Sequence, residues 1–256
     1  MSGRAALELK GLSMRFGGLK AVEGVDLDVR EGEIVSLIGP NGAGKTTIFN
    51  CVTGQYRPTS GTVTLFGRAR LDGLPPHTVS RLGVVRTFQN IRLFPAMTAL
   101  ENVMVGRHCR TRAGVLGALI QGPRVLREER AIRDSARELL AFAGLSQHEE
   151  SLARNLPYGE QRRLEIARAL AAEPRVLCLD EPAAGMNPNE TGALMDLVAE
   201  IRLRGVTVFL IEHHMQMVMG ISDRVCVLDH GVKIAEGRPE EVQRDPAVVS
   251  AYLGEG

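Results

Sequence analysis

Apolar and polar residues follow two different patterns along this chain. Residues 34–38 and 176–179 are short apolar runs, which are typical of strands buried on both faces of a parallel sheet. Residues 7–29 instead alternate between apolar and polar in short pieces, and this alternation predicts edge or antiparallel strands. From residue 98 to about residue 172 the pattern becomes helical. The chain therefore predicts an α/β protein with a separate helical region.

Further strands are predicted on both sides of this helical region. They cover residues 62–66, 83–88, 205–211, 224–229 and 232–235. The last two strands would form a hairpin, and residues 239–253 predict a closing helical segment that is broken at Pro246.

Local signals mark the helices of the central region. Thr98 and Glu101 have the spacing of a capping box, which predicts a helix start. Residues 124–142 predict a charged amphipathic helix that Gly144 ends. Another helix is expected from about residue 160 to residue 172, after Pro157.

Composition and charge add only broad limits. The 256 residues suffice for one large domain or two small ones. A net charge of +1, from 31 basic and 30 acidic residues, gives no general argument for a nucleic-acid partner. There is no signal-peptide pattern, and no apolar run approaches the roughly 18 residues that span a bilayer. We therefore expect a chain that is soluble by itself.

Two further features have ordinary interpretations. Cys51, Cys109, Cys178 and Cys226 lie far apart with no C-x-x-C pair, which predicts buried free thiols rather than metal or redox chemistry. Residues 113–122 are apolar and uncharged, and we expect an ordinary loop there rather than a mobile or partner-facing segment.

A glycine-rich loop follows the strand at residues 34–38. It has the form G-x-x-x-x-G-K-[ST] and consists of Gly39, Pro40, Asn41, Gly42, Ala43, Gly44, Lys45, Thr46 and Thr47. Glycines allow backbone N–H groups to approach an anion, and the helix that follows adds the positive end of its dipole. Lys45 would reach the β- and γ-phosphates of a nucleoside triphosphate, and the Thr46 hydroxyl would hold Mg²⁺.

Polar residues with suitable chemistry follow three other predicted strands. Gln89 follows residues 83–88, Asp180 and Glu181 end the strand that begins at Val176, and His213 follows residues 205–211. Ligands of open α/β sheets bind at the carboxyl ends of the strands, so these side chains are expected at one site. Asp180 and Glu181 are adjacent at the end of one strand, so their carboxylates are expected to point to opposite sides of it. Phe16 precedes two glycines in the predicted turn between two strands. Its ring either packs inside a hairpin or forms a flat surface on which an adenine stacks.

Taken together, this order of motifs resembles the ATP-binding cassette ATPases of membrane transporters, from about residue 7 to residue 253. The resemblance implies one nucleotide-binding domain over residues 1–256, of the α/β class. A RecA-like P-loop core with an antiparallel β subdomain would occupy residues 1–88 and 173–238. The α-helical subdomain would occupy residues 89–172, and a C-terminal helical segment residues 239–256.

The resemblance also assigns a role to each candidate residue. Phe16 would stack on the adenine of ATP, and Gln89 would contact Mg²⁺ and communicate with a membrane subunit. Asp180 would be the metal carboxylate, and Glu181 would polarise the attacking water. His213 would be the switch histidine near the γ-phosphate.

The signature segment of this family departs here from its common Leu-Ser-Gly-Gly-Gln form. The chain has Leu156, Pro157, Tyr158, Gly159 and Glu160 at these positions. The serine hydroxyl is missing, Pro157 lacks a backbone N–H, and Glu160 would place a carboxylate near the partner's γ-phosphate. In this family two cassettes pair head to tail, with residues 183–187 resembling the loop that crosses the interface. We expect a heterodimer with unequal sites, the stronger built on Lys45, although a homodimer is possible.

Particular stretches are similar to one branch of the family. Residues 16–22, 159–170, 180–188, 211–215 and 251–255 look like the ATPase subunits of bacterial branched-chain amino acid importers. The resemblance implies ATP and Mg²⁺ as cofactors, a second ATPase subunit, two integral-membrane permeases and, indirectly, an extracytoplasmic solute-binding protein. It places the chain peripherally on the cytoplasmic face of the inner membrane.

Other functions are alternatives at this point. Related importers of urea, amides, other amino acids or lipopolysaccharide have similar ATPases. Soluble cassettes of DNA repair or translation usually carry two cassettes or a long coiled-coil insertion, and neither is evident here. A GTPase switch would be expected to carry an Asn-Lys-x-Asp run, which is absent.

Overall fold

The computed structural model describes residues 3–107 and 123–253. The predicted loop at residues 113–122 and Cys109 lie outside the described residues. The chain divides into two compact units. The first contains Met1–Gln89 and Arg175–Gly256, and the second contains Asn90–Pro174.

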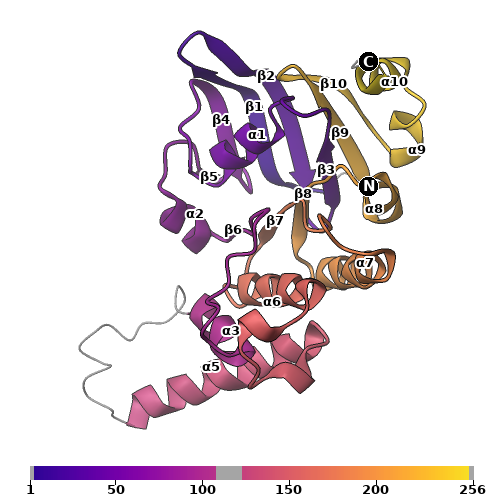
Figure 1. Ribbon diagram of the computed structural model, residues 1–256. Coiled ribbons are helices and arrows are strands. Elements are labelled where there is room, and N and C mark those ends of the chain that lie inside the picture. Colours follow the sequence, from indigo (N-terminus) through magenta and orange to yellow (C-terminus); the bar gives the residue numbers. More distant parts are fainter. Residues whose placement is uncertain (1–2, 108–122, 254–256) are drawn as a thin grey trace. The chain divides into compact units, whose positions relative to one another are not determined.

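A six-stranded sheet forms the main layer of the first unit, in the order β10-β9-β3-β8-β7-β6 (Figure 1). Its strands are β3 (Ile34–Ile38), β6 (Val84–Arg86), β7 (Val176–Asp180), β8 (Thr207–Ile211), β9 (Arg224–Asp229) and β10 (Val232–Gly237). All neighbours pair in parallel except the hairpin of β9 and β10. Every residue of β3, β7 and β8 is buried, as expected for apolar runs covered on both faces.

A second, antiparallel sheet has the order β2-β1-β4-β5. It consists of β1 (Ala5–Phe16), β2 (Leu19–Arg30), β4 (Ser60–Leu65) and β5 (Ala69–Arg70). Leu9 of β1 pairs with Leu27 of β2 on one side and with Val63 of β4 on the other. β1 is therefore an inner strand. Its antiparallel pairing with both neighbours, interrupted by bulges, confirms the antiparallel arrangement predicted from the sequence.

One hydrophobic core joins the two sheets through α1 (Lys45–Val52). Its members include Leu9 and Leu27 of the antiparallel sheet, Ile48 and Phe49 of α1, and Phe209 of β8. The rings of Phe49 and Phe209 pack with their centroids 4.7 Å apart. Because α1 is packed against both sheets, the loop that precedes it is held in place relative to the strand ends.

The remaining helices of this unit connect and flank the strands. They are α2 (Pro76–Leu82), α7 (Pro188–Leu203), α8 (Met215–Ile221), α9 (Pro239–Val242) and α10 (Pro246–Leu253). The break between α9 and α10 confirms the interruption predicted at Pro246. Asn187 caps α7 with a capping box, in which the Glu190 N–H donates to the Asn187 side chain at 3.0 Å.

The three described cysteines are buried free thiols, as predicted. They are Cys51 of α1, Cys178 of β7 and Cys226 of β9. Burial raises the pKa of the Cys178 thiol to about 12, so it remains protonated and unreactive at neutral pH.

The second unit is helical. It contains α3 (Ala99–Arg107), α5 (Pro123–Phe142) and α6 (Tyr158–Leu170), with single 3₁₀ turns at Ser146–His148 and Ala153–Asn155. The Thr98 N–H donates to Glu101 at 2.8 Å and the Glu101 N–H donates to Thr98 at 3.1 Å, which confirms the capping box. α6 begins slightly earlier than predicted, at Tyr158, with Pro157 at the N-cap position.

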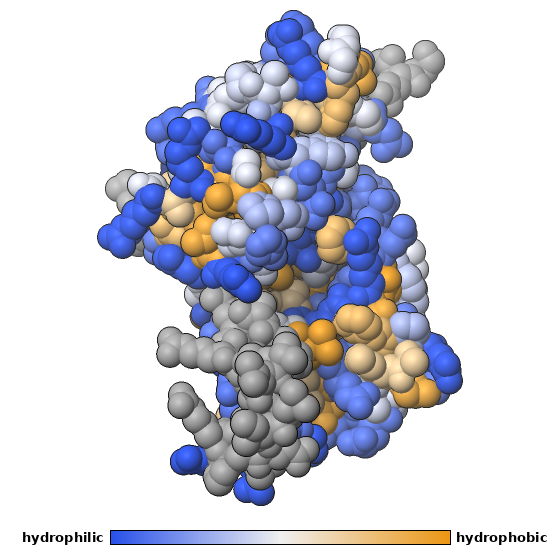
Figure 2. Space-filling view, turned by 90° about the vertical axis from the view of Figure 1, so that its left-hand side faces the viewer, coloured by the Kyte–Doolittle hydropathy of each residue, from blue (hydrophilic) through white to orange (hydrophobic). Residues whose placement is uncertain are grey.

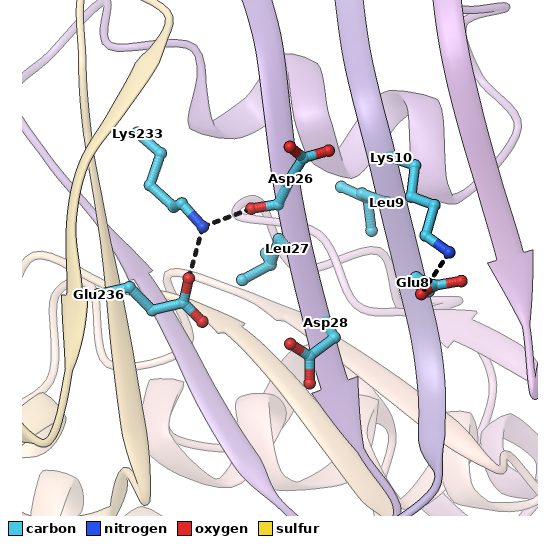
Figure 3. Close-up of a pocket in the computed structure, with 8 residues that line it drawn as sticks. All are labelled: Glu8, Leu9, Lys10, Asp26, Leu27, Asp28, Lys233 and Glu236. Atoms are coloured by element: carbon cyan, nitrogen blue, oxygen red, sulfur yellow. Dashed lines mark hydrogen bonds and ion pairs between the residues drawn. The ribbon is translucent and has the colours of Figure 1, made fainter.

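Charged side chains link the two sheets of the first unit at the hollow drawn in Figure 3. Lys233 of β10 donates to the Asp26 carbonyl of β2 and to Glu236, both at 2.6 Å. Arg224 of β9 donates to Glu33 at 3.0 Å, to Asp28 and to Glu236. Burial and these carboxylates act on Arg224 in opposite directions, and the carboxylates prevail, so its pKa is raised.

Figure 2 shows apolar residues on one face in separate patches with hydrophilic residues between them. Among the described residues, no helix has the length and apolar character needed to cross a membrane.

We predict that Arg224→Met lowers the free energy of unfolding by about 3 kcal/mol, because it removes the counter-ion of the partly buried Glu33 carboxylate and one of the counter-ions of Asp28 and Glu236. Urea denaturation of the full chain measures this value. Arg70→Met is the matched control, because Arg70 forms a more exposed ion pair with Asp72 and should be nearly neutral. Equal effects of the two substitutions would contradict a structural role for Arg224.

Candidate nucleotide site

The glycine loop joins β3 to α1 through backbone conformations that require glycine. Gly39 has a φ of +146°, and a Cβ there would lie 2.0 Å from the Leu228 carbonyl oxygen. Gly44 has a φ of +99°, and its Cβ would lie 2.5 Å from the Ala21 carbonyl oxygen. Lys45 Nζ donates to the carbonyls of Gly39 at 2.6 Å and Pro40 at 2.8 Å. The Lys45 ammonium group therefore lies inside the loop, where phosphate groups would also bind.

A cavity of about 540 Å³ opens at this loop. It is lined by Phe16, Leu19, Lys20, Ala21, Asn41, Gly42, Ala43, Gly44, Lys45, Thr46, Thr47, Glu181 and His230. The structure thus brings the predicted aromatic residue, the phosphate loop and the predicted catalytic carboxylate to one cavity. Backbone N–H groups at the start of α1 and the Lys45 charge make its floor suitable for an anion.

Phe16 lies at the end of β1 with its side chain partly exposed to this cavity. The residue is 41% exposed, and its ring meets Tyr56 edge-on with centroids 5.2 Å apart. A ring that packed inside the hairpin would be buried. The exposure of Phe16 therefore favours a role in stacking on a flat ligand. Tyr56, which supports the ring, was not singled out from the sequence.

Glu181 lies just beyond the end of β7. The strand ends at Asp180, and Glu181 has a φ of +45°, so simple alternation along a strand does not describe the two carboxylates. The Glu181 N–H donates to the Ile211 carbonyl at 2.9 Å, which fixes the turn. This left-handed conformation is uncommon for a residue with a side chain, and such backbone strain is concentrated at functional sites.

Three predicted catalytic residues meet at the Glu181 carboxylate. Gln89 Nε2 donates to Glu181 Oε2 at 2.7 Å, and His213 Nδ1 lies 3.7 Å from the same oxygen. The His213 side chain is 60% exposed, so it is accessible to a ligand at the sheet edge. The carboxyl ends of β6, β7 and β8 therefore do place these side chains together.

Asp180 has a different environment. Its side chain is buried, and Arg86 Nη2 donates to Asp180 Oδ2 at 2.5 Å. Arg86, at the end of β6, was not identified from the sequence because it lies within a predicted strand. Only the pairing of β6 with β7 shows that the two charges are neighbours.

Glu212 is a second residue that was not identified from the sequence. It is fully buried and accepts hydrogen bonds from the N–H groups of Ala183 at 3.0 Å, His213 at 2.8 Å and His214 at 2.9 Å. It thereby fixes the backbone on both sides of the site. The sequence does contain a signal for Glu212, because it directly follows a wholly apolar strand. A carboxylate at such a position is expected to be buried and therefore to need hydrogen-bond donors.

The predicted signature residues lie in the second unit at the start of α6. Gly159 is buried and the Tyr158 side chain is exposed. Glu160 Oε2 lies 3.0 Å from His148 Nε2, and Glu160 Oε1 lies 3.9 Å from Arg163 Nη2. The carboxylate is therefore paired within its own unit, whereas the sequence had suggested a carboxylate directed at a partner's phosphate.

A buried ion pair stabilises the same helix. Arg162 Nη1 donates to Glu165 Oε2 at 2.8 Å, and both side chains are almost fully buried. Glu165 also accepts the Arg92 N–H at 3.0 Å, and Arg162 Nη2 donates to the Tyr158 hydroxyl at 3.3 Å. Burial raises the pKa of the Glu165 carboxyl, although these partners act to lower it. The pair fixes Tyr158 through its hydroxyl.

The residues predicted to hold a metal ion have suitable donor atoms. Thr46, Gln89 and Asp180 offer a hydroxyl, an amide carbonyl and a carboxylate, and oxygen donors of this kind suit Mg²⁺. Within the described part of the chain, no group of three or more His, Cys, Asp or Glu could hold a metal. A metal ion here would therefore depend on phosphate oxygens of the nucleotide for further ligands.

These features define a P-loop ATPase. A family model described as ABC transporter matches residues 22–184, and one described as Branched-chain amino acid ATP-binding cassette transporter matches residues 232–256. The chain belongs to the ABC transporter family as an ATP-hydrolysing cassette.

Similar proteins cover nearly the whole chain. The high-affinity branched-chain amino acid transport ATP-binding protein LivG of Salmonella typhimurium is 53% identical over 250 residues, which are 97% of this chain and 98% of the relative. The corresponding protein BraF of Pseudomonas aeruginosa is 51% identical over 253 residues, 98% of this chain and 99% of the relative. These relatives confirm the family suggested by the sequence motifs.

Solved structures confirm the fold. A nucleotide-free ATP-binding cassette from an ABC transporter has a TM-score of 0.85 and 32% identity, covering 98% of this chain and all of that chain. A dimeric cassette in a post-hydrolysis state bound to ADP and phosphate has a TM-score of 0.76 and 26% identity, covering 91% and 98%.

We predict that Lys45→Ala weakens ATP affinity by about 10- to 150-fold, because it removes charge-assisted hydrogen bonds worth about 1.5–3 kcal/mol. Titration with a fluorescent ATP analogue measures the dissociation constant. Lys10→Ala is the control, because Lys10 is an exposed lysine of β1 paired with Glu8. An unchanged affinity in Lys45→Ala would contradict the proposed phosphate loop.

Proposed function

We propose that this chain binds ATP with Mg²⁺ and hydrolyses it to power an importer of branched-chain amino acids. The observation that carries the ATPase site is the cavity shared by the phosphate loop and Glu181, with Gln89 and His213 beside that carboxylate. The names of the full-length relatives and the C-terminal family match support the transported substrate.

Binding would use the loop and the aromatic ring of Phe16. Phe16 would stack on the adenine, and Lys45 would exchange its loop carbonyls for β- and γ-phosphate oxygens. Thr46, Asp180 and Gln89 would hold Mg²⁺, which when bound neutralises charge on the phosphate oxygens. The backbone N–H groups at the α1 N-terminus would supply the remaining contacts.

Hydrolysis would be a direct transfer of the γ-phosphoryl group to water. Glu181 would accept a hydrogen bond from the water and orient it in line with the bond to be broken. The water oxygen would bond to the γ-phosphorus as the bond to the bridging oxygen breaks, and the water proton would pass to Glu181, giving ADP and phosphate. His213 would donate to a γ-phosphate oxygen, and Lys45 would stabilise the same charge.

The site is proposed to be completed by a second cassette. One similar structure is a dimer bound to ADP and phosphate, which supports pairing of cassettes in this family. Pro157, Tyr158, Gly159 and Glu160 would face the partner's nucleotide across a head-to-tail interface. We propose a heterodimer, with a homodimer as the alternative, coupled to two membrane permeases and indirectly to an extracytoplasmic solute-binding protein. The chain would then act at the cytoplasmic face of the membrane.

The signature supports a difference between the two ATP sites. Pro157 offers no N–H and takes the place of the signature serine, whose hydroxyl is missing, so this chain presents fewer donors to the partner's nucleotide. Its own phosphate loop retains the full set of donors. The site built on Lys45 is therefore proposed to be the more active one. A related importer of urea, amides, other amino acids or lipopolysaccharide is the alternative function.

Replacing Glu181 by Gln should reduce ATP turnover at least about 100-fold, because the amide orients water poorly and cannot serve as a base. ATP affinity should be retained, since Gln89 can still bond to the new side chain. Phosphate release and equilibrium binding are measured in parallel, with Glu31→Gln as an exposed control. Normal turnover in the Glu181 variant would refute the proposed role.

Nucleotide trapping tests the inequality of the two sites. In the assembled pair, the phosphate-loop lysine of one cassette is replaced at a time, so that only the other site can hydrolyse ATP. We expect more hydrolysed nucleotide to be trapped when the Lys45 site is the intact one than when the partner's site is. Equal turnover at both sites would exclude the proposed difference.

A further inference from the structure

Arg86 forms a charged contact inside the first unit that none of the roles above uses. Its Nη2 donates to Asp180 Oδ2 at 2.5 Å, and its Nη1 donates to the Asn50 amide oxygen of α1 at 2.6 Å. Each side chain of the Arg86–Asp180 pair is 7% exposed. The guanidinium also lies 5.6 Å from the ring centroid of Phe49 and 5.1 Å from that of Phe88.

The pair compensates two charges that would otherwise be buried alone. Asn50 and the two rings are neutral, so Asp180 is the anion with which Arg86 forms its ion pair. Arg86 Nε is buried without a hydrogen-bond partner among the described residues. The rings and Asn50 hold the guanidinium in position, so its charge is presented to Asp180 in a fixed geometry.

A carboxylate held this closely by one cation is a weaker ligand for another. Two cations that share an anion repel each other, and each reduces the other's affinity by the same factor. Arginine does not lose its charge at any physiological pH, so it cannot yield by deprotonation. A metal ion can therefore bind to Asp180 only if other negative charge arrives with it or if the guanidinium moves away.

We propose that Arg86 competes with the divalent cation for Asp180 in the ATP complex and thereby limits how much the metal strengthens ATP binding. This inference rests on the proposed role of Asp180 as the metal carboxylate. The triphosphate brings negative charge that outweighs Arg86, so the metal still binds in the ATP complex, but with a lower affinity than it would have without the guanidinium. Arg86 acts through Asp180 and is a positioning residue rather than a catalytic one.

The decisive quantity is the factor by which Mg²⁺ strengthens ATP binding. It is the ratio of dissociation constants for a fluorescent ATP analogue measured in EDTA and in excess Mg²⁺, on the full chain. Arg86→Gln removes the charge but keeps an amide donor for Asp180, and we expect this ratio to rise at least about fivefold over wild type. Arg86→Lys keeps the charge, and its ratio should stay within about twofold of wild type.

A ratio in Arg86→Gln that is equal to or below the wild-type value would overturn the proposal. A decrease would show that Arg86 orients the carboxylate for the metal instead of competing with it. Thermal unfolding without ligands confirms that each variant is folded. The readout is binding, so it is independent of turnover.

A second measurement observes the competition directly in the wild-type chain, and a variant serves only for the assignment. The ¹⁵N resonance of Arg86 Nε, assigned by its absence in Arg86→Lys, should shift when Mg²⁺ is added to the ATP complex. An unchanged resonance would contradict competition at Asp180. Asp180→Asn tests the metal role of Asp180 separately from the competition by Arg86. If this variant keeps the wild-type ratio of dissociation constants in EDTA and in Mg²⁺, Asp180 is not the metal carboxylate. The proposed metal site and the proposed competition would then both be wrong.

Discussion

The burial of α1 between the two sheets is the constraint on which the nucleotide site depends. Ile48 and Phe49 belong to the core shared by both sheets, so the first turn of α1 cannot shift without opening that core. The glycine loop before it has conformations that no other residue type adopts easily, and it gains its order from the fixed elements at its two ends. Apolar packing at the ends of the loop thus adds to the hydrogen bonds that Lys45 donates within it.

Each carboxylate at the sheet edge has a different partner, and this difference separates their roles. Asp180 is buried beside a permanent cation, Glu181 is bonded to a neutral amide, and Glu212 is enclosed by backbone N–H groups. Asp180 can bind a metal ion only in competition with Arg86. Glu181 keeps the negative charge available to water, and Glu212 is committed to holding the backbone. Three acids within one short stretch of sheet therefore need not interfere with one another.

The sequence predicted the elements that depend on local patterns, and missed those that depend on strand order. Apolar runs identified β3, β7 and β8, and strand-end polar residues identified Gln89, Glu181 and His213. β1 was expected as short pieces because Gly11 and polar residues interrupt it, yet pairing with both β2 and β4 makes it one strand with bulges. Arg86 was missed because its partner lies 94 residues away. The pairing of Glu160 with His148 also depends on tertiary packing, so the sequence showed the carboxylate without its counter-ion.

The central claim is that this cassette converts ATP hydrolysis into import of branched-chain amino acids. The most direct test is phosphate release by the transporter reconstituted in vesicles with its permeases, partner cassette and solute-binding protein. Leucine, isoleucine or valine should raise the rate of phosphate release, and this stimulation should be lost in the Glu181→Gln variant. A rate that responds to urea or an amide but not to these amino acids, or a stimulation that survives in the variant, would contradict the central claim.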